Sequence, residues 1–133
     1  MRVSELMQKD VKTVHLEDAV NDAVVSLTDS HISALAVVDG MGRMVGVISS
    51  TDILTSEAEA QDAVEREALF EQMMVRDIMT PRPLTVTPEA DVRQAAQQML
   101  YADIHRLFVT SANQVVGVIS STDIVRAVAT GRL

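Results

Sequence analysis

Cysteine is absent from the 133 residues of this chain, and aromatic residues make up only 2% of them. Without cysteine the chain cannot form disulfides, thiolate metal sites or a thiol nucleophile. The only aromatic residues, Phe70, Tyr101 and Phe108, are too few for a platform on which successive bases of a nucleic acid stack. A chain without cysteine suits a reducing compartment, so we expect a cytoplasmic protein.

Positive charge is also scarce, because 11 lysine and arginine residues face 19 acidic residues and the net charge is -8. Phosphate backbones are bound by clustered basic residues, so this composition argues against nucleic-acid binding. No apolar run approaches the roughly 18 residues of a membrane span, and residues 1–10 lack the pattern of a signal peptide. Apolar residues nevertheless make up 47% of the chain, which is enough to bury a core. We expect a globular protein that does not bind membranes.

One segment of nine residues occurs twice: VGVISSTDI stands at 45–53 and again at 116–124. Upstream, at an offset of 72 residues, TVHLEDAV at 13–20 aligns with TVTPEADV at 85–92, and VSELM at 3–7 with VRDIM at 75–79. The offset falls to 71 after the stretch 39–42, where the loss of one residue from a hairpin turn costs little. The chain therefore contains two copies of one structural unit.

We assign residues 1–54 to the first repeat, 55–74 to an acidic helical linker and 75–133 to the second repeat. Each repeat predicts a short strand, an amphipathic helix, two hairpin strands and a last helix, the order β-α-β-β-α of a mixed α/β (α+β) fold. The helix after Thr85 is expected to start with Thr87 as N-cap and Pro88 as its first residue. In the first repeat the last helix is expected to continue through Leu69 to Met73. One repeat is too small to be stable alone, so the two should pack sheet to sheet about a pseudo-twofold axis.

This order, the segments MTPRPLTV and GVISSTDI, and the duplication resemble the cystathionine-β-synthase (CBS) domain pair, or Bateman module, over nearly the whole chain. The most specific pattern is a glycine, two apolar residues, a serine, two further residues and an aspartate, present at 46–52 and 117–123. The resemblance implies a stand-alone regulatory module without catalysis or a required cofactor. Such a module binds AMP, ADP, ATP or S-adenosylmethionine in clefts between its repeats. The resemblance also implies a homodimer, with an effector protein as a further partner.

The pairs Ser49-Asp52 and Ser120-Asp123 stand where the last helix of each repeat begins. A capping box explains them at least in part, because both residue types satisfy free N–H groups at a helix start. Recent duplication is another explanation for the identity of nine residues. The functional interpretation is additional: an ionised carboxylate can accept hydrogen bonds from both vicinal hydroxyls of a ribose. Asp52 and Asp123 are therefore candidate ribose ligands.

His105-Arg106 is the candidate phosphate anchor, because arginine offers a planar fork of donors. A surface salt bridge is the alternative role of Arg106. The resemblance implies two crossed clefts. Because the first contains His105-Arg106 and the second Ser33-Ala34, we expect a phosphate-bearing ligand in the first and a less charged one in the second. The first would contain Ser49, Asp52, Thr85, Ile104, His105 and Arg106, and the second Ser120, Asp123, Thr13, Ile32, Ser33 and Ala34. Strand propensity is the alternative explanation for the two threonines, and core packing for the isoleucines.

The alternative function is a ligand-free module that dimerises and docks a protein partner through its acidic helix. An enzyme is disfavoured, because the sequence contains no P-loop, no His-Glu-x-x-His and no nucleophile–base pair. His15 and His31 have no partner at a metal-binding spacing, so we predict no metal site.

Overall fold

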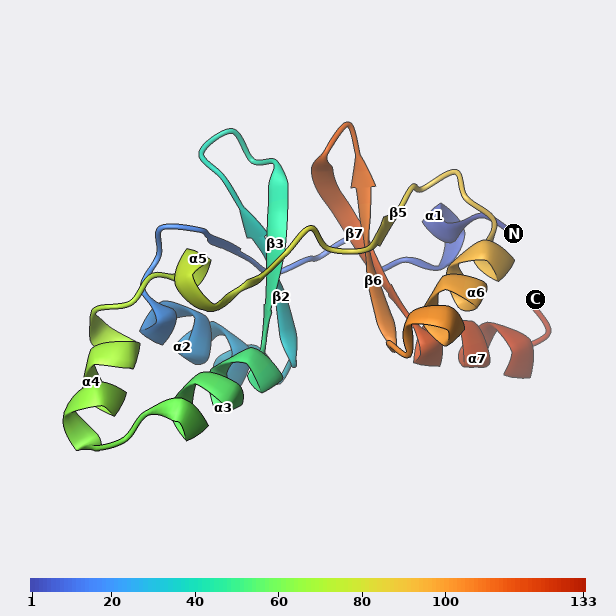
Figure 1. The fold of residues 1–133 in the computed structure, drawn as a ribbon. Coiled ribbons are helices and arrows are strands. Elements are labelled where there is room, and N and C mark those ends of the chain that lie inside the picture. Colours follow the sequence, from blue (N-terminus) through green and yellow to red (C-terminus); the bar gives the residue numbers. More distant parts are fainter. The chain divides into compact units, whose positions relative to one another are not determined.

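The computed structural model describes residues 1–133, except for the side chain of Leu69 (Figure 1). The chain forms two compact units, which we describe separately. The continuous unit is Lys12–Pro83, and the split unit combines Met1–Val11 with Leu84–Leu133. The compact units are therefore not simply the two sequence repeats, because the segment that starts each repeat belongs to the unit built mainly from the other one.

The continuous unit contains a four-stranded sheet in the order β1-β2-β3-β4. The first strand is parallel to the second, and the other neighbours are antiparallel. The strands are β1 (Thr13–His15), β2 (Ala34–Val38), β3 (Met44–Ser49) and β4 (Thr80–Pro81). The helices are α2 (Val20–Ser30), α3 (Ser50–Glu59), α4 (Ala63–Glu71) and α5 (Val75–Ile78). The predicted order β-α-β-β-α is confirmed for this repeat.

The split unit repeats this arrangement with a three-stranded sheet in the order β5-β6-β7. Its strands are β5 (Thr85–Val86), β6 (Arg106–Ser111) and β7 (Gln114–Ser120). Its helices are α1 (Val3–Leu6), α6 (Val92–Ala102) and α7 (Ser121–Ala129). The N-terminal segment joins the sheet at Gln8, which forms an antiparallel bridge with Val118. Here too the predicted order is confirmed. Among the described residues of both units, no helix is long and apolar enough to cross a bilayer.

Each unit has its own core, built from alternate residues of its two hairpin strands. In the continuous unit Leu35 and Ile48 are fully buried, and Val75 of α5 packs into the same cluster. In the split unit Leu107 and Ile119 are buried with Val3 of α1. Residues 1–11 and 75–83, which we call the exchanged segments, are therefore structural parts of the units that they enter.

The hairpin turns confirm the site of the one-residue difference. In the split unit Ala112 and Asn113 both have positive φ (51° and 66°), as in the two-residue turns typical of hairpins. The longer turn at 39–43 is held by Asp39, whose Oδ1 accepts hydrogen bonds from the N–H groups of Met41 (2.9 Å) and Arg43 (3.0 Å). Partial desolvation raises the pKa of Asp39. The hydrogen bonds from these N–H groups and the charge of the Arg43 guanidinium together lower it by more, so the pKa lies below its ordinary value.

Two predictions about helices are wrong. The helix after β5 begins at Val92 with Asp91 as N-cap, whose carboxylate accepts from the Arg93 N–H at 2.8 Å. The stretch 87–90 is instead a turn, and its Pro88 and Ala90 carbonyls accept hydrogen bonds from the N-terminal segment. Thr87 and Pro88 therefore lie before the helix. The carbonyls of Pro88 and Ala90 pair with the distant N-terminal segment, which no local pattern reveals.

The acidic linker is not a continuation of α3, because that helix ends at Glu59 and α4 starts at Ala63. Asp62 caps the new helix by accepting from the Glu65 N–H at 2.9 Å. An acidic N-cap followed three residues later by glutamate is a recognisable start signal, so the sequence did contain the evidence for this break. The side chain of Leu69, assigned to the same predicted helix, lies outside what the structure describes.

The glycine of the repeated segment is required by a close approach of two backbones. A Cβ at Gly46 would lie 2.7 Å from Met79 Sδ and 2.8 Å from the Thr80 carbonyl oxygen. At Gly117 it would lie 2.5 Å from Met7 Sδ and 3.0 Å from the Gln8 carbonyl oxygen. A methionine side chain can move, but the carbonyls are fixed by strand pairing. The exchanged segments therefore pass directly over these glycines.

We expect Gly46→Ala to lower the free energy of unfolding by about 1–3 kcal/mol, the usual cost of overpacking a fixed site. Urea denaturation of the variant and the wild type measures this difference. Gly40→Ala is the matched control, because the nearest atom to its added Cβ is 3.9 Å away. Equal stability of the two variants would show that the backbones do not approach closely at Gly46.

Candidate functional site

The repeated segment forms the same strand-to-helix corner in both units, at the ends of β3 and β7. Ser49 is the N-cap of α3: its Oγ accepts from the Asp52 N–H at 3.1 Å, and Asp52 Oδ2 accepts from the Ser49 N–H at 2.9 Å. Ser120 and Asp123 make the same pair of bonds at 3.1 and 2.8 Å at the start of α7. The predicted capping boxes are confirmed, and in each aspartate one oxygen, Oδ2, is used for capping.

The other carboxylate oxygen, Oδ1, meets the exchanged segment in each unit. Asp52 Oδ1 accepts from the Thr80 hydroxyl at 3.1 Å. Asp123 Oδ1 accepts from the Gln8 side-chain amide at 3.2 Å and lies 3.6 Å from Arg126 Nη1. Gln8 and Thr80 occupy the same position in the two repeats, 72 residues apart. The two acidic side chains therefore sit in related but unequal settings: Asp123 is buried, with 8% of the residue exposed, whereas Asp52 is partly exposed.

Two other candidates of the first repeat, Ser33 and Ala34, lie close to this corner in the continuous unit. The Ser33 carbonyl accepts a hydrogen bond from the Ser50 N–H at 2.9 Å, so the start of β2 is tied to the start of α3. Ser33 is exposed, Ala34 begins β2 and is partly buried, and Ile32 packs against the core. Thr13 is exposed at the start of β1. The structure thus places Ser33 and Ala34 beside the helix tip that carries Asp52.

The candidates of the second repeat lie at the equivalent places in the split unit. The His105 carbonyl accepts from the Ser121 N–H at 2.9 Å. Arg106 begins β6 and is partly buried, and Ile104 packs against the core. The Thr85 hydroxyl lies 3.4 Å from that of Thr110. Within this unit, the backbone of His105, part of the proposed phosphate anchor, is therefore hydrogen-bonded to the residue two positions before Asp123.

Within each unit the structure joins Ser33 or His105 to the tip of the last helix, whereas Thr13 and Thr85 lie on the neighbouring strand, where they pair with Ala36 and Phe108. The two crossed clefts combine residues of different units and stay a prediction. His105 also lines a cavity of about 240 Å³ that includes Asp103, Ile104 and Ser121 and whose other walls come from α6 and α7. This small cavity is apolar over most of its wall. It contains neither of the candidate ribose carboxylates.

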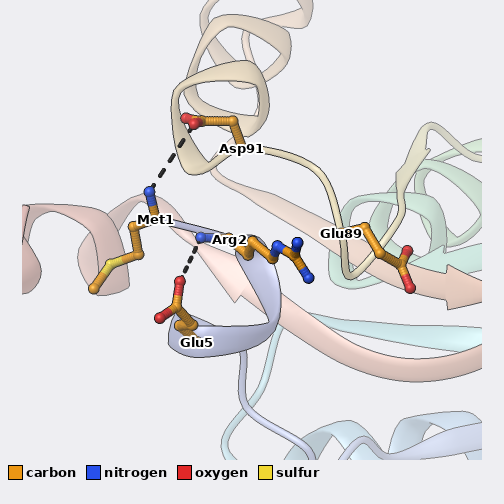
Figure 2. Close-up of a pocket in the computed structure, with 5 residues that line it drawn as sticks. All are labelled: Met1, Arg2, Glu5, Glu89 and Asp91. Carbon is orange, nitrogen blue, oxygen red and sulfur yellow. Dashed lines mark hydrogen bonds and ion pairs between the residues drawn. The ribbon is translucent and has the colours of Figure 1, made fainter.

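A larger cavity of about 570 Å³ lies at the N-terminal side of the split unit (Figure 2). It is lined by Met1, Arg2, Glu5, Glu89 and Asp91. The Arg2 N–H donates to Glu5 Oε2 at 2.6 Å, and the Met1 amino group lies 4.0 Å from Asp91 Oδ2. The wall is mostly charged and contains no candidate residue, so this cavity has little of the apolar surface that an adenine ring needs.

Sequence reasoning missed three residues around the candidate carboxylates: Gln8, Thr80 and Arg126. Their repeat alignment could have identified the first two as equivalent, but nothing in the sequence shows that a residue 115 positions away donates to Asp123. Among the described side chains, no group of three histidine, aspartate or glutamate residues is placed to hold a metal ion.

Comparison with known proteins gives consistent matches over both repeats. A family model described as CBS domain matches residues 3–59 and 75–130. The crystal structure of CBSX2 in complex with AMP, a protein of Arabidopsis thaliana, is 27% identical with a TM-score of 0.83, covering 99% of this chain and 98% of that one. The CBS domain pair of protein MJ0100, in complex with 5′-methylthioadenosine and S-adenosyl-L-methionine, is 26% identical with a TM-score of 0.82 and 98% coverage of both chains.

Curated relatives include larger proteins. The homoserine O-acetyltransferase of Methanohalobium evestigatum is 28% identical over 127 residues, which are 95% of this chain but 24% of the enzyme. The chain spans about a quarter to less than two thirds of the length of relatives such as this enzyme and CBSX1 of Arabidopsis thaliana.

Proposed function

Because the chain belongs to the CBS domain family, we propose that it is a regulatory module that binds an adenosyl compound, with Asp52 and Asp123 as the ribose ligands. One similar solved structure holds AMP, and another holds 5′-methylthioadenosine and S-adenosyl-L-methionine. All three ligands carry adenine on a ribose that has a 2′,3′-diol. The common part of these ligands is therefore the adenosyl group, and we propose the same class for this chain. The likeness to the acetyltransferase covers a quarter of that enzyme, so no catalytic activity is proposed.

The observation that carries this proposal is that the two carboxylate oxygens of each aspartate have different hydrogen-bond partners. Oδ2 caps the helix, which fixes the carboxylate in one orientation at the helix tip. Each carboxylate oxygen can accept two hydrogen bonds, and at Asp52 Oδ1 the Thr80 hydroxyl supplies one of them. A capped, ionised carboxylate in a fixed orientation is a suitable acceptor for a vicinal diol.

Transmission of a signal is part of the proposal, and the exchanged segments support it. Gln8 and Thr80 contact the candidate ribose carboxylates, and each lies three residues before a unit boundary, at Val11 and Pro83 respectively. A ligand that changes the hydrogen bonds of Asp52 or Asp123 thereby acts on a segment that leads into the other unit. Differential affinity of the ligand for two arrangements of these segments would shift their populations.

Calorimetry with AMP, ADP, ATP and S-adenosylmethionine tests the proposal. We expect at least one of them to bind and to raise the melting temperature, because a ligand that binds only the folded state stabilises it. The alternative is a ligand-free module that dimerises and docks a basic protein partner. That function would be supported if none of the four compounds bound while sedimentation showed a salt-sensitive complex with such a partner.

A further inference from the structure

The two candidate ribose carboxylates differ at the oxygen that is not used for capping. Asp52 Oδ1 has the uncharged Thr80 hydroxyl as a donor. Asp123 Oδ1 accepts a hydrogen bond from the Gln8 amide at 3.2 Å and forms an ion pair with the Arg126 guanidinium, whose Nη1 lies 3.6 Å away. The positive charge of Arg126 therefore lies beside the oxygen at which a ribose hydroxyl would have to bind. A ribose hydroxyl that donates to this oxygen would compete with these two groups for it.

Arg126 is the group that is easier to displace. Its side chain is 66% exposed, whereas that of Asp123 is only 7% exposed. Gln8 is held in place because its backbone N–H and carbonyl both pair with Val118, at 2.8 and 2.9 Å. The guanidinium, at the end of a long exposed side chain, can move into solvent without breaking a backbone hydrogen bond.

We propose that Arg126 competes with the ribose for Asp123 and so sets a lower affinity for an adenosyl ligand at Asp123 than at Asp52. This inference rests on the proposed function and adds an affinity-determining residue to it. The first repeat has no such competitor, because the position equivalent to Arg126 is Thr55, 71 residues earlier, whose side chain is short and uncharged. We call Asp123 the guarded site, because a cation is paired with its carboxylate. Asp52 is the unguarded site, because its Oδ1 accepts from the uncharged Thr80 hydroxyl.

Adenosine is the probe of choice, because it has the ribose diol but no phosphate to which Arg126 could be attracted directly. In an Asp52→Asn background, which isolates the guarded site, Arg126→Gln should tighten adenosine binding about two- to fivefold, the effect of an ion pair with one exposed partner. In an Asp123→Asn background, the converse change Thr55→Arg should weaken adenosine binding by a similar factor. Arg93→Gln, which removes an exposed arginine from α6, is the control and should leave the affinity unchanged.

Titration calorimetry and melting temperatures are recorded for every variant, so that a loss of folding is not mistaken for a loss of affinity. Higher salt should also tighten adenosine binding at the guarded site, because it screens the Arg126–Asp123 pair. If the wild type binds AMP or adenosine but Arg126→Gln binds adenosine no more tightly, Arg126 is not a competitor. If only AMP binding weakens, Arg126 is instead a phosphate ligand and the inference is wrong. If the wild type binds no adenosyl compound, the proposed function fails and this inference fails with it.

Discussion

Removal of residues 1–8 is expected to unfold the split unit and to leave the continuous unit folded. The deleted segment contributes Val3, which is fully buried against Val86, Ala95 and Met99, and the partly buried Leu6 and Met7. It also contributes Gln8, which bridges to β7. Loss of these contacts should cost on the order of 4 kcal/mol or more, a large part of the stability of a small domain. The deletion at the N-terminus should thus unfold residues 84–133, the part of the chain that is most distant from it in sequence.

Hydrogen exchange measured by mass spectrometry distinguishes the two units. The deletion should abolish protection in the strands and helices between residues 85 and 129 and preserve it between 34 and 59. A milder, matched pair of variants makes the same test without truncation: Val3→Ala and Val75→Ala remove the same atoms from equivalent buried positions. The first should reduce protection in the split unit and the second in the continuous unit. Uniform loss in both would contradict the exchange of segments.

The order of helices and strands could be predicted from the sequence because both repeats carry it independently. The short apolar runs of β2 and β6, each buried at three successive positions, and the serine and aspartate of the two capping boxes are local signals that need no knowledge of distant residues. The duplicated corner was located correctly for the same reason. Where one repeat was ambiguous, the other provided a second instance of the same pattern.

The remaining features depend on contacts between distant residues. Pro88 was predicted to start a helix because its local preference favours that place, but its carbonyl accepts from Ser4 and the helix starts later. The donors to Asp52 and Asp123 come from segments 28 and 115 residues away. Gly46 and Gly117 were recognised as part of a motif, but the motif does not show that a carbonyl oxygen passes within 3.0 Å of the place of a Cβ.

The ribose role itself predicts that Asp52→Asn and Asp123→Asn each weaken the binding of AMP about tenfold or more at the affected site. An asparagine has one oxygen, and the capping position demands it, because the Ser49 or Ser120 N–H needs an acceptor there. The amide NH2 then takes the place of Oδ1 and presents donors to the donors of the ribose. Loss of a hydrogen bond to a charged acceptor costs about 1.5–3 kcal/mol, which corresponds to at least that factor.

Calorimetry with AMP and 2′-deoxy-AMP separates this role from a general loss of structure. The wild type should prefer AMP, and a variant that lacks both carboxylates should lose the preference together with most of its affinity. Asp62→Asn is the matched control, because Asp62 caps α4 by the same kind of bond, at 2.9 Å, and is not a candidate ligand. It removes the same charge and should bind AMP as the wild type does. If Asp52→Asn and Asp123→Asn behave like this control, the two aspartates serve only to cap their helices.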